Sequence, residues 1–336
     1  MRGFIPGLVL AVFGGVLTGS FTAPMKFTKN WAWENTWLIY AIIGLACLPV
    51  AVALMSVPHL MAVYRVASPT AVTLAVLFGF GWGVGSVLLG AGVNRLGLAL
   101  GFAIIIGLTA ALGSLIPLIV LFPRALFTSH GASVLTGLAI VVCGIILCAK
   151  AGAIRNASGV STVRRDRYHE GLLICVGAGV FSSMLNLALA FGSPVAGAAI
   201  QHGATPTAAQ NAIWALAAGA GSLANIGYAL FLICRNRSWG RFNVAGSGMN
   251  LLLGVLMGVL WMAGVVVYGA GAAALGNWGA IIGWPLFMSM VIVTGNVWGL
   301  LTGEWKNAPS AALRLSLAGV GVLIIAIAVI SMGSTL

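Results

Sequence analysis

The sequence predicts an all-α polytopic membrane protein with ten transmembrane helices, arranged as two inverted five-helix repeats. Three observations lead to this fold class. Of the 336 residues, 61% are hydrophobic and only 6% are charged, whereas a soluble domain carries about a quarter charged residues. The apolar residues form long runs, and parts of the second half of the chain repeat the first. A water-soluble globule, a disordered chain and a disulfide-bonded secreted scaffold are excluded.

The ten spans follow from the length of these apolar runs, because a spanning helix needs about 20 apolar residues. Lipid offers no hydrogen-bond partner to the backbone, so each run must be helical. The first run also resembles a signal peptide, but it recurs later in the chain and we expect it to be a span. The predicted spans are 4–23, 36–57, 70–93, 97–121, 132–149, 171–192, 208–233, 249–272, 279–302 and 311–332.

One long polar connection, residues 150–170, divides the chain into a first repeat (1–149) and a second repeat (171–336). Alternating the connections across the membrane places Arg2, Arg65 and Arg124 on one side and all other Lys and Arg residues on the side of this linker. Because basic residues concentrate in cytoplasmic loops, we expect a cytoplasmic linker and both termini outside. The membrane is then the plasma membrane, which is the inner membrane in a bacterium.

The internal repeat is clearest between the third and eighth spans, at an offset of 179 residues. Identical pairs there include Gly79 with Gly258, Trp82 with Trp261 and Gly85 with Gly264. The first and sixth spans match more weakly at an offset of 164. Five helices per repeat make the second copy enter from the opposite face, which is the architecture of alternating-access carriers.

Uncharged polar and aromatic side chains inside the spans indicate a neutral substrate. Amides and hydroxyls both donate and accept hydrogen bonds, as the hydroxyls of a sugar require, and an indole offers a flat surface for a sugar ring. Packing and membrane-interface anchoring are the alternative roles of the tryptophans, and Trp37 near a span end is predicted to be such an anchor. The candidate substrate-binding residues are Trp82, Ser86, Asn186, Asn225, Trp261, Tyr268 and Trp284.

Groups that could carry chemistry are few. The four carboxylates are Glu34, Asp166, Glu170 and Glu304, all in the linker or at predicted cytoplasmic ends of spans. No acid or histidine cluster and no nucleophile with its base is visible, so we expect no enzyme, no catalytic residue, no metal site and no cofactor. The basic residues are explained by topology and anionic lipid headgroups, and no nucleic-acid-binding module is expected.

Several stretches resemble the L-rhamnose–proton symporter family, a branch of the drug/metabolite transporter superfamily. They are residues 26–37 (KFTKNWAWENTW), 78–85 (FGFGWGVG), 95–97 (RLG), 225–228 (NIGY), 260–261 (LW) and 303–308 (GEWKNA). The resemblance implies uptake of a deoxyhexose driven by the proton gradient. The chain departs from it around 281–289, where Ile281 and Phe287 are apolar.

The matched Glu34 and Glu304 are the candidate coupling or gating groups. Their alternative role is structural, paired with Lys29 or Lys306 or accepting hydrogen bonds from helix ends.

The expected function is therefore proton-coupled uptake of a small neutral sugar, L-rhamnose or a related deoxyhexose, by alternating access. Its partners are the sugar, the proton and the lipid bilayer. Two alternatives remain open at this point. One is an exporter, a uniporter or a sodium-coupled carrier of another small metabolite, and the other is a structural membrane protein that transports nothing.

Overall fold

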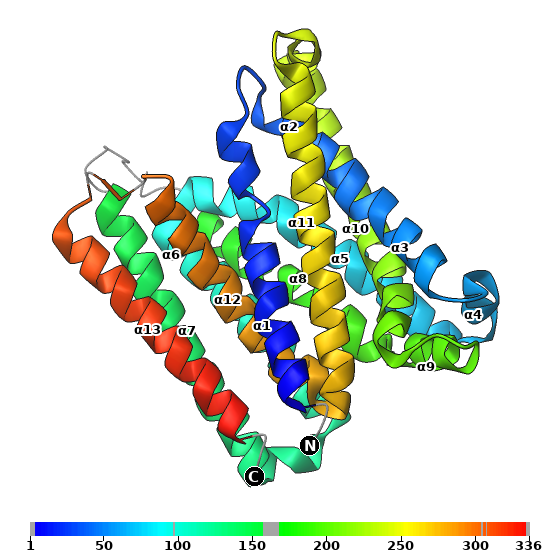
Figure 1. The fold of residues 1–336 in the computed structure, drawn as a ribbon. Coiled ribbons are helices and arrows are strands. Elements are labelled where there is room, and N and C mark those ends of the chain that lie inside the picture. The colour runs from blue at the N-terminus through cyan, green and yellow to red at the C-terminus, as the bar shows by residue number, and fades with distance from the viewer. Residues whose placement is uncertain (1–3, 97, 157–167, 304, 307, 334–336) are drawn as a thin grey trace.

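The computed structural model describes residues 4–96, 98–156, 168–303, 305–306 and 308–333, and the regular structure of these residues is helical (Figure 1). Ten helical segments in it are long and apolar enough to cross a membrane. The predicted all-α class and the ten spans are confirmed.

The first half contains five of these segments together with short helices at their ends. In chain order the elements are α1 (Phe4–Ser20), the 3₁₀ helix η1 (Ala23–Phe27), α2 (Trp33–Tyr40), the π-helix η2 (Ala41–Cys47), α3 (Leu48–Ser56), α4 (Leu60–Val66), α5 (Pro69–Leu96), α6 (Leu98–Leu121), η3 (Pro123–Phe127) and α7 (Ser129–Asn156).

The second half contains the other five segments. Its elements are α8 (Tyr168–Phe191), α9 (Ser193–Gln201), α10 (Pro206–Asn236), η5 (Ser238–Asn243), α11 (Ser247–Ala274), η6 (Gly276–Trp278), α12 (Gly279–Leu301) and α13 (Ser310–Gly333).

Three details differ from the sequence prediction. The short helices α4 and α9 were not predicted as separate elements. The second span is built from α2, η2 and α3, and its wide π-turn precedes Pro49, which has no N–H to continue the α-helical pattern. The helix α7 continues to Asn156, so the start of the predicted linker is helical, and residues 157–167 lie outside the described part.

The helices alternate in direction across the bundle. In Figure 1, α1 begins and α13 ends at the lower end, α4 and α9 lie at the right-hand side, and η1 and η5 lie at the upper end. The helix α1 packs between α11 and α12, α5 packs on α8 and α10, and α7 lies along α13.

Repeat-equivalent glycines make close backbone contacts with the opposite half. Gly79 of α5 lies against the backbone of Ala217 in α10, and its mate Gly258 of α11 lies against Gly44 in η2. A Cβ at either glycine would overlap its partner, so the missing side chain is what allows the approach. The third span thus contacts the seventh as the eighth contacts the second.

A second pair of equivalent glycines, Gly85 and Gly264, also makes close contacts with the opposite half, here with the sixth and first spans. Gly85 of α5 lies against Ser182 of α8, and its mate Gly264 of α11 lies against Thr18 of α1. The third span therefore contacts the sixth, and the eighth contacts the first, through the same repeat positions.

Candidate functional site

The two repeat-equivalent tryptophans meet at the centre of the bundle. The ring centroids of Trp82 on α5 and Trp261 on α11 lie 5.2 Å apart, with 24° between the ring planes. Both side chains are buried, at 9% and 4% exposed. The pair therefore joins one helix from each half through an aromatic stack.

A polar group lies around Asn225 of α10. Its Oδ1 accepts hydrogen bonds from Ser86 Oγ of α5 at 2.9 Å and from Trp37 Nε1 of α2 at 3.1 Å. Its Nδ2 donates to the carbonyl oxygen of Gly221 at 3.0 Å and to that of Gly83 at 3.5 Å. The amide thus ties α2, α5 and α10 together. Besides stacking on a neighbouring tryptophan, Trp37 takes part in this internal network, which its predicted role as an interfacial anchor did not include.

A second polar group lies around Asn186 of α8, which is fully buried. Its Nδ2 donates to the carbonyl oxygens of Gly113 in α6 and Ala280 in α12, each at 2.7 Å. Its Oδ1 accepts from the hydroxyl of Tyr268 in α11 at 2.5 Å. One amide therefore connects four helices.

Trp284 of α12 completes this second group. Its Nε1 donates to the carbonyl oxygen of Thr109 in α6 at 2.9 Å. Its ring stacks on Phe287, with centroids 5.5 Å apart, and is tilted against Tyr268 at 5.7 Å. The indole is fixed by a hydrogen bond on one edge and by aromatic contacts on its faces.

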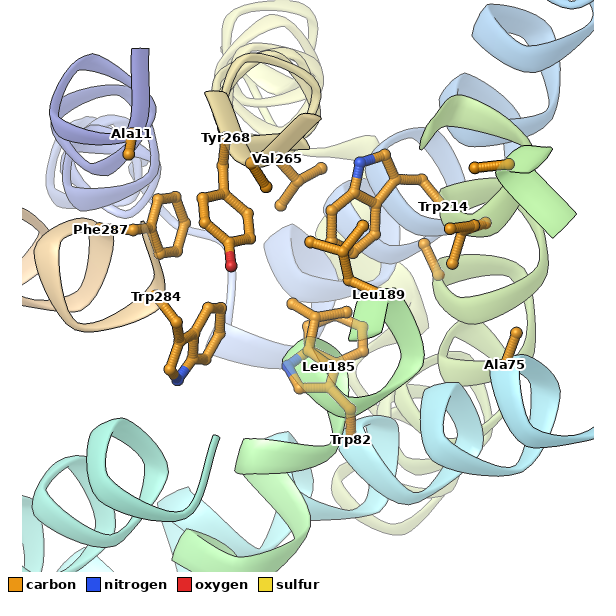
Figure 2. Close-up of a cluster of buried hydrophobic side chains, with 14 of the residues drawn as sticks. Ala11, Ala75, Trp82, Leu185, Leu189, Trp214, Val265, Tyr268, Trp284 and Phe287 are labelled. Atoms are coloured by element: carbon orange, nitrogen blue, oxygen red, sulfur yellow. The ribbon is translucent and has the colours of Figure 1, made fainter. Parts of the chain in front are cut away.

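Figure 2 shows Tyr268, Phe287 and Trp284 together, and across from them Trp82 and Trp214. The seven predicted substrate-binding residues thus form three sets: the stacked Trp82 and Trp261, Ser86 bonded to Asn225, and the group around Asn186. Ser86 is partly buried and the other six are buried.

Two aromatic residues at the centre were missed. Tyr40 contacts Trp261 edge-on at 6.5 Å, and it lies one helical turn after Trp37, a spacing that the sequence offered as a signal. Trp214 is fully buried 6.2 Å from Tyr268, and within the described residues its Nε1 has no hydrogen-bond partner. Nothing in its Ala- and Gly-rich surroundings marks it in the sequence.

Glu34 at the start of α2 is buried, at 5% exposed. Its Oε1 accepts from Asn236 Nδ2 at 3.0 Å and from Ser238 Oγ at 2.9 Å, so it fastens α2 to the α10–α11 connection. Both hydrogen-bond donors are neutral, and the positive charge of Arg241 also acts on the carboxylate. The backbone of Lys29 bonds to Asn250. The other candidate coupling group, Glu304, lies outside the described residues.

The opposite end of the bundle is also fastened by hydrogen bonds. Tyr64 of α4 donates to the carbonyl oxygen of Ala212 at 2.9 Å, and Asn211 Nδ2 donates to Ser56 Oγ at 2.9 Å. Burial raises the pKa of Tyr64, so its phenol stays protonated and keeps donating. Polar contacts hold α10 to the first half at both ends.

Among the described residues, no group of three or more His, Cys, Asp and Glu side chains is placed to hold a metal ion. The five cysteines are free thiols.

Comparison with known proteins decides the family. A family model described as L-rhamnose-proton symport protein (RhaT) matches residues 2–335. The chain belongs to the RhaT family. An L-rhamnose-proton symporter of Klebsiella pneumoniae is 28% identical over 334 residues, covering 97% of both chains. Symporters of the same name from Escherichia coli and Salmonella gallinarum are each 27% identical, covering 97% and 98% of both chains. As a RhaT-family protein the chain is a membrane transporter, not an enzyme.

Proposed function

We propose that this RhaT-family protein takes up L-rhamnose or a related deoxyhexose together with a proton, by alternating access. The end-to-end family match and the similarity to L-rhamnose-proton symporters support the sugar and the proton. The relatives are only 27–28% identical to this chain, so the choice of L-rhamnose among the deoxyhexoses is part of what we propose. The linker faces the cytoplasm and both termini face outward, as the distribution of Lys and Arg favours.

The two halves are inverted repeats. The equivalent glycines of α5 and α11 support this, because each contacts the corresponding helices of the other half. A pair of inverted repeats exposes a shared site alternately to the two sides by rocking against each other. Helix faces lined with glycine suit this motion, since close backbones without side chains interlock little.

The observation that carries the sugar site is the stack of Trp82 on Trp261 where the halves meet. At 5.2 Å the rings contact each other directly, so a sugar ring enters only when they separate. The sugar then replaces one indole as the stacking partner of the other.

Hydrogen bonds from both sides fix the sugar between the tryptophans. Ser86 and Asn225 supply a hydroxyl and an amide from α5 and α10. Tyr268 of α11 supplies a second hydroxyl, and Trp284 of α12 lies beside it (Figure 2). Asn186 holds the Tyr268 hydroxyl. The bond between Ser86 and Asn225 is exchanged for bonds to sugar hydroxyls on opening, whereas the Tyr268 oxygen keeps donating to Asn186 and accepts a hydrogen bond from the sugar.

Glu34 is the proposed coupling group, with Glu304 as a second carboxylate on a matched motif. A buried carboxylate held by neutral donors changes the stability of its end of the bundle when it binds a proton. Protonation therefore favours release of α2 from the α10–α11 connection.

The function is tested with purified protein in liposomes and radiolabelled L-rhamnose. An inward proton gradient is expected to drive saturable accumulation that a protonophore abolishes and that a sodium gradient does not replace. Uptake that ignores the protonophore would contradict proton coupling, and no saturable uptake of any deoxyhexose would contradict the substrate class.

Glu34→Gln keeps the side-chain oxygen that accepts from Ser238 but removes the titrating group. The variant is expected to exchange sugar across the membrane yet fail to accumulate it against a gradient. Glu170→Gln, at an exposed position at the start of α8, is the matched control and should accumulate sugar normally. Accumulation by Glu34→Gln at the wild-type level would exclude Glu34 as the coupling group.

A further inference from the structure

Two neighbouring helices are interrupted by proline within their helical spans. Pro117 lies inside α6 and Pro285 inside α12, and these two helices contact each other. Proline has no backbone N–H, so the carbonyl four residues earlier loses its helical donor. The carbonyls concerned are those of Gly113 in α6 and Ile281 in α12.

Each of these two carbonyls has a side-chain donor from another helix. Asn186 Nδ2 of α8 donates to Gly113 O at 2.7 Å, and Ser114 Oγ of α6 donates to Ile281 O at 2.5 Å. Asn186 and Ser114 are both fully buried. A buried carbonyl without a donor is costly, so these two side chains replace the N–H groups that the prolines lack.

The same two side chains also join α6 to α12. Asn186 donates its second N–H to Ala280 O of α12, next to the residue that Ser114 binds. The hydrogen bonds therefore run from the first half to the second at one level of the bundle. They hold the interrupted turn of α12 against α6.

That turn of α12 carries Trp284, so the position of Trp284 depends on the hydrogen bonds that hold α12 against α6. Its Nε1 bonds to Thr109 O of α6, and the ring lies so close to Gly113 that a Cβ there would overlap the indole nitrogen. Tyr268 donates to the remaining atom of the Asn186 amide. Trp284 and Tyr268 are thus positioned through Asn186 and Ser114.

We propose that Asn186 and Ser114 are positioning residues for transport, which stand in for the backbone donors missing at Pro285 and Pro117 and thereby place Trp284 and Tyr268 at the sugar site. They act through these aromatic side chains. The last step rests on the proposed function, whereas the replacement of the missing donors does not. The sequence predicted that Asn186 contacts the sugar directly. We propose instead that it holds Tyr268, which contacts the sugar.

Paired substitutions test the replacement of donors. Ser114→Ala is expected to lower the Tm of the purified protein by about 3 °C or more. In a Pro285→Ala background, residue 285 supplies an N–H to Ile281 O, so the same Ser114→Ala change should cost less than half as much. Asn186→Ala should likewise be relieved by Pro117→Ala, but only in part, because Asn186 also binds Ala280 and Tyr268.

The crossed pairs are the controls. Ser114→Ala with Pro117→Ala, and Asn186→Ala with Pro285→Ala, should lower the Tm additively, because each restored N–H lies at the wrong carbonyl. Equal loss in the matched and crossed backgrounds would overturn the proposal. This outcome needs no transport and is distinguishable from a failure of the proposed function.

Sugar uptake tests the positioning role. Ser114→Ala is expected to raise the KM for L-rhamnose at least threefold. Pro285→Ala in the same chain restores an N–H to Ile281 O but not the bond to α6, so the KM should stay raised while the Tm recovers. A Ser114→Ala protein that loses Tm but keeps its KM would be merely destabilised and would contradict the positioning role. If Asn186→Ala fails to fold, the Ser114 and Pro285 pair decides the question alone.

Discussion

The amides of Asn225 and Asn186 are both fully buried and both bonded at each end, yet they stabilise different structures. Asn225 donates to the carbonyls of Gly221 and Gly83, which lie in helices without proline at the following turn and keep their backbone donors. Asn186 donates to Gly113, whose backbone donor is lost at Pro117. The Asn225 amide adds hydrogen bonds to carbonyls that keep their backbone donors, whereas the Asn186 amide supplies the donor that Pro117 removes.

This difference assigns separate tasks to two regions of the bundle. The group around Asn225 joins α2 to α5 and α10, whose backbone hydrogen bonds are not interrupted by proline at this level. The group around Asn186 joins α6 and α12 at interruptions, where helices bend most easily. We expect the second region to be the more sensitive to substitution.

The largest expected effect separates the two amides directly. Asn186→Asp turns a donor into a charged acceptor facing two carbonyls, and should cost about 3–5 kcal/mol of unfolding free energy. Asn225→Asp also faces two carbonyls, but both keep their backbone donors and the carboxylate still accepts from Trp37 and Ser86, so it should cost about half as much. Thermal unfolding of both variants measures the difference. Equal losses would remove the distinction between the regions.

The next effect concerns the space beside Trp284. Gly113→Ala should cost about 2 kcal/mol because its Cβ overlaps the indole and displaces the bond to Thr109. Gly107→Ala in the same helix is the control. A Cβ there meets nothing within 4 Å, so this change should stabilise the helix by about 0.5–1 kcal/mol. A neutral Gly113→Ala would show that Trp284 is not held where the structure places it.

The smallest effect sharpens the description of the Asn225 region. Trp37→Phe keeps an aromatic ring but removes the donor to Asn225, and should cost about 1 kcal/mol. Ser86 still donates to the same oxygen, so Trp37→Phe with Ser86→Ala should cost more than the sum of the single changes. Strict additivity would indicate that the two donors do not share their acceptor.

Much of this arrangement could be predicted from the sequence. Composition and run length predicted the ten spans, because lipid forces every apolar run to form its own backbone bonds. The duplication identified Trp82 and Trp261 as equivalent positions and as candidate sugar contacts, and the structure brings the two rings into contact. Sequence reasoning also placed Ser86, Asn225, Asn186 and Tyr268 correctly inside spans.

The rest depended on contacts between helices that are distant in the chain. Pro117 and Pro285 are visible in the sequence, and a proline inside a helix leaves a carbonyl without its donor. The side chain that supplies a donor to Gly113, however, comes from another helix, 73 positions away. Trp37 lies near a span end, as a membrane-interface anchor does, and only the position of Asn225 shows that it also turns inward. Which residues of distant helices form hydrogen bonds with each other is determined by how the helices pack, and the local sequence pattern does not show it.

The most direct test of the central claim is equilibrium binding of radiolabelled L-rhamnose to the purified protein and two variants. If the sugar stacks between the halves, Trp261→Ala should weaken binding about tenfold. Trp239→Ala, at a 52% exposed position on η5, should bind as the wild type does. Unchanged affinity in Trp261→Ala would contradict a sugar site at the tryptophan pair.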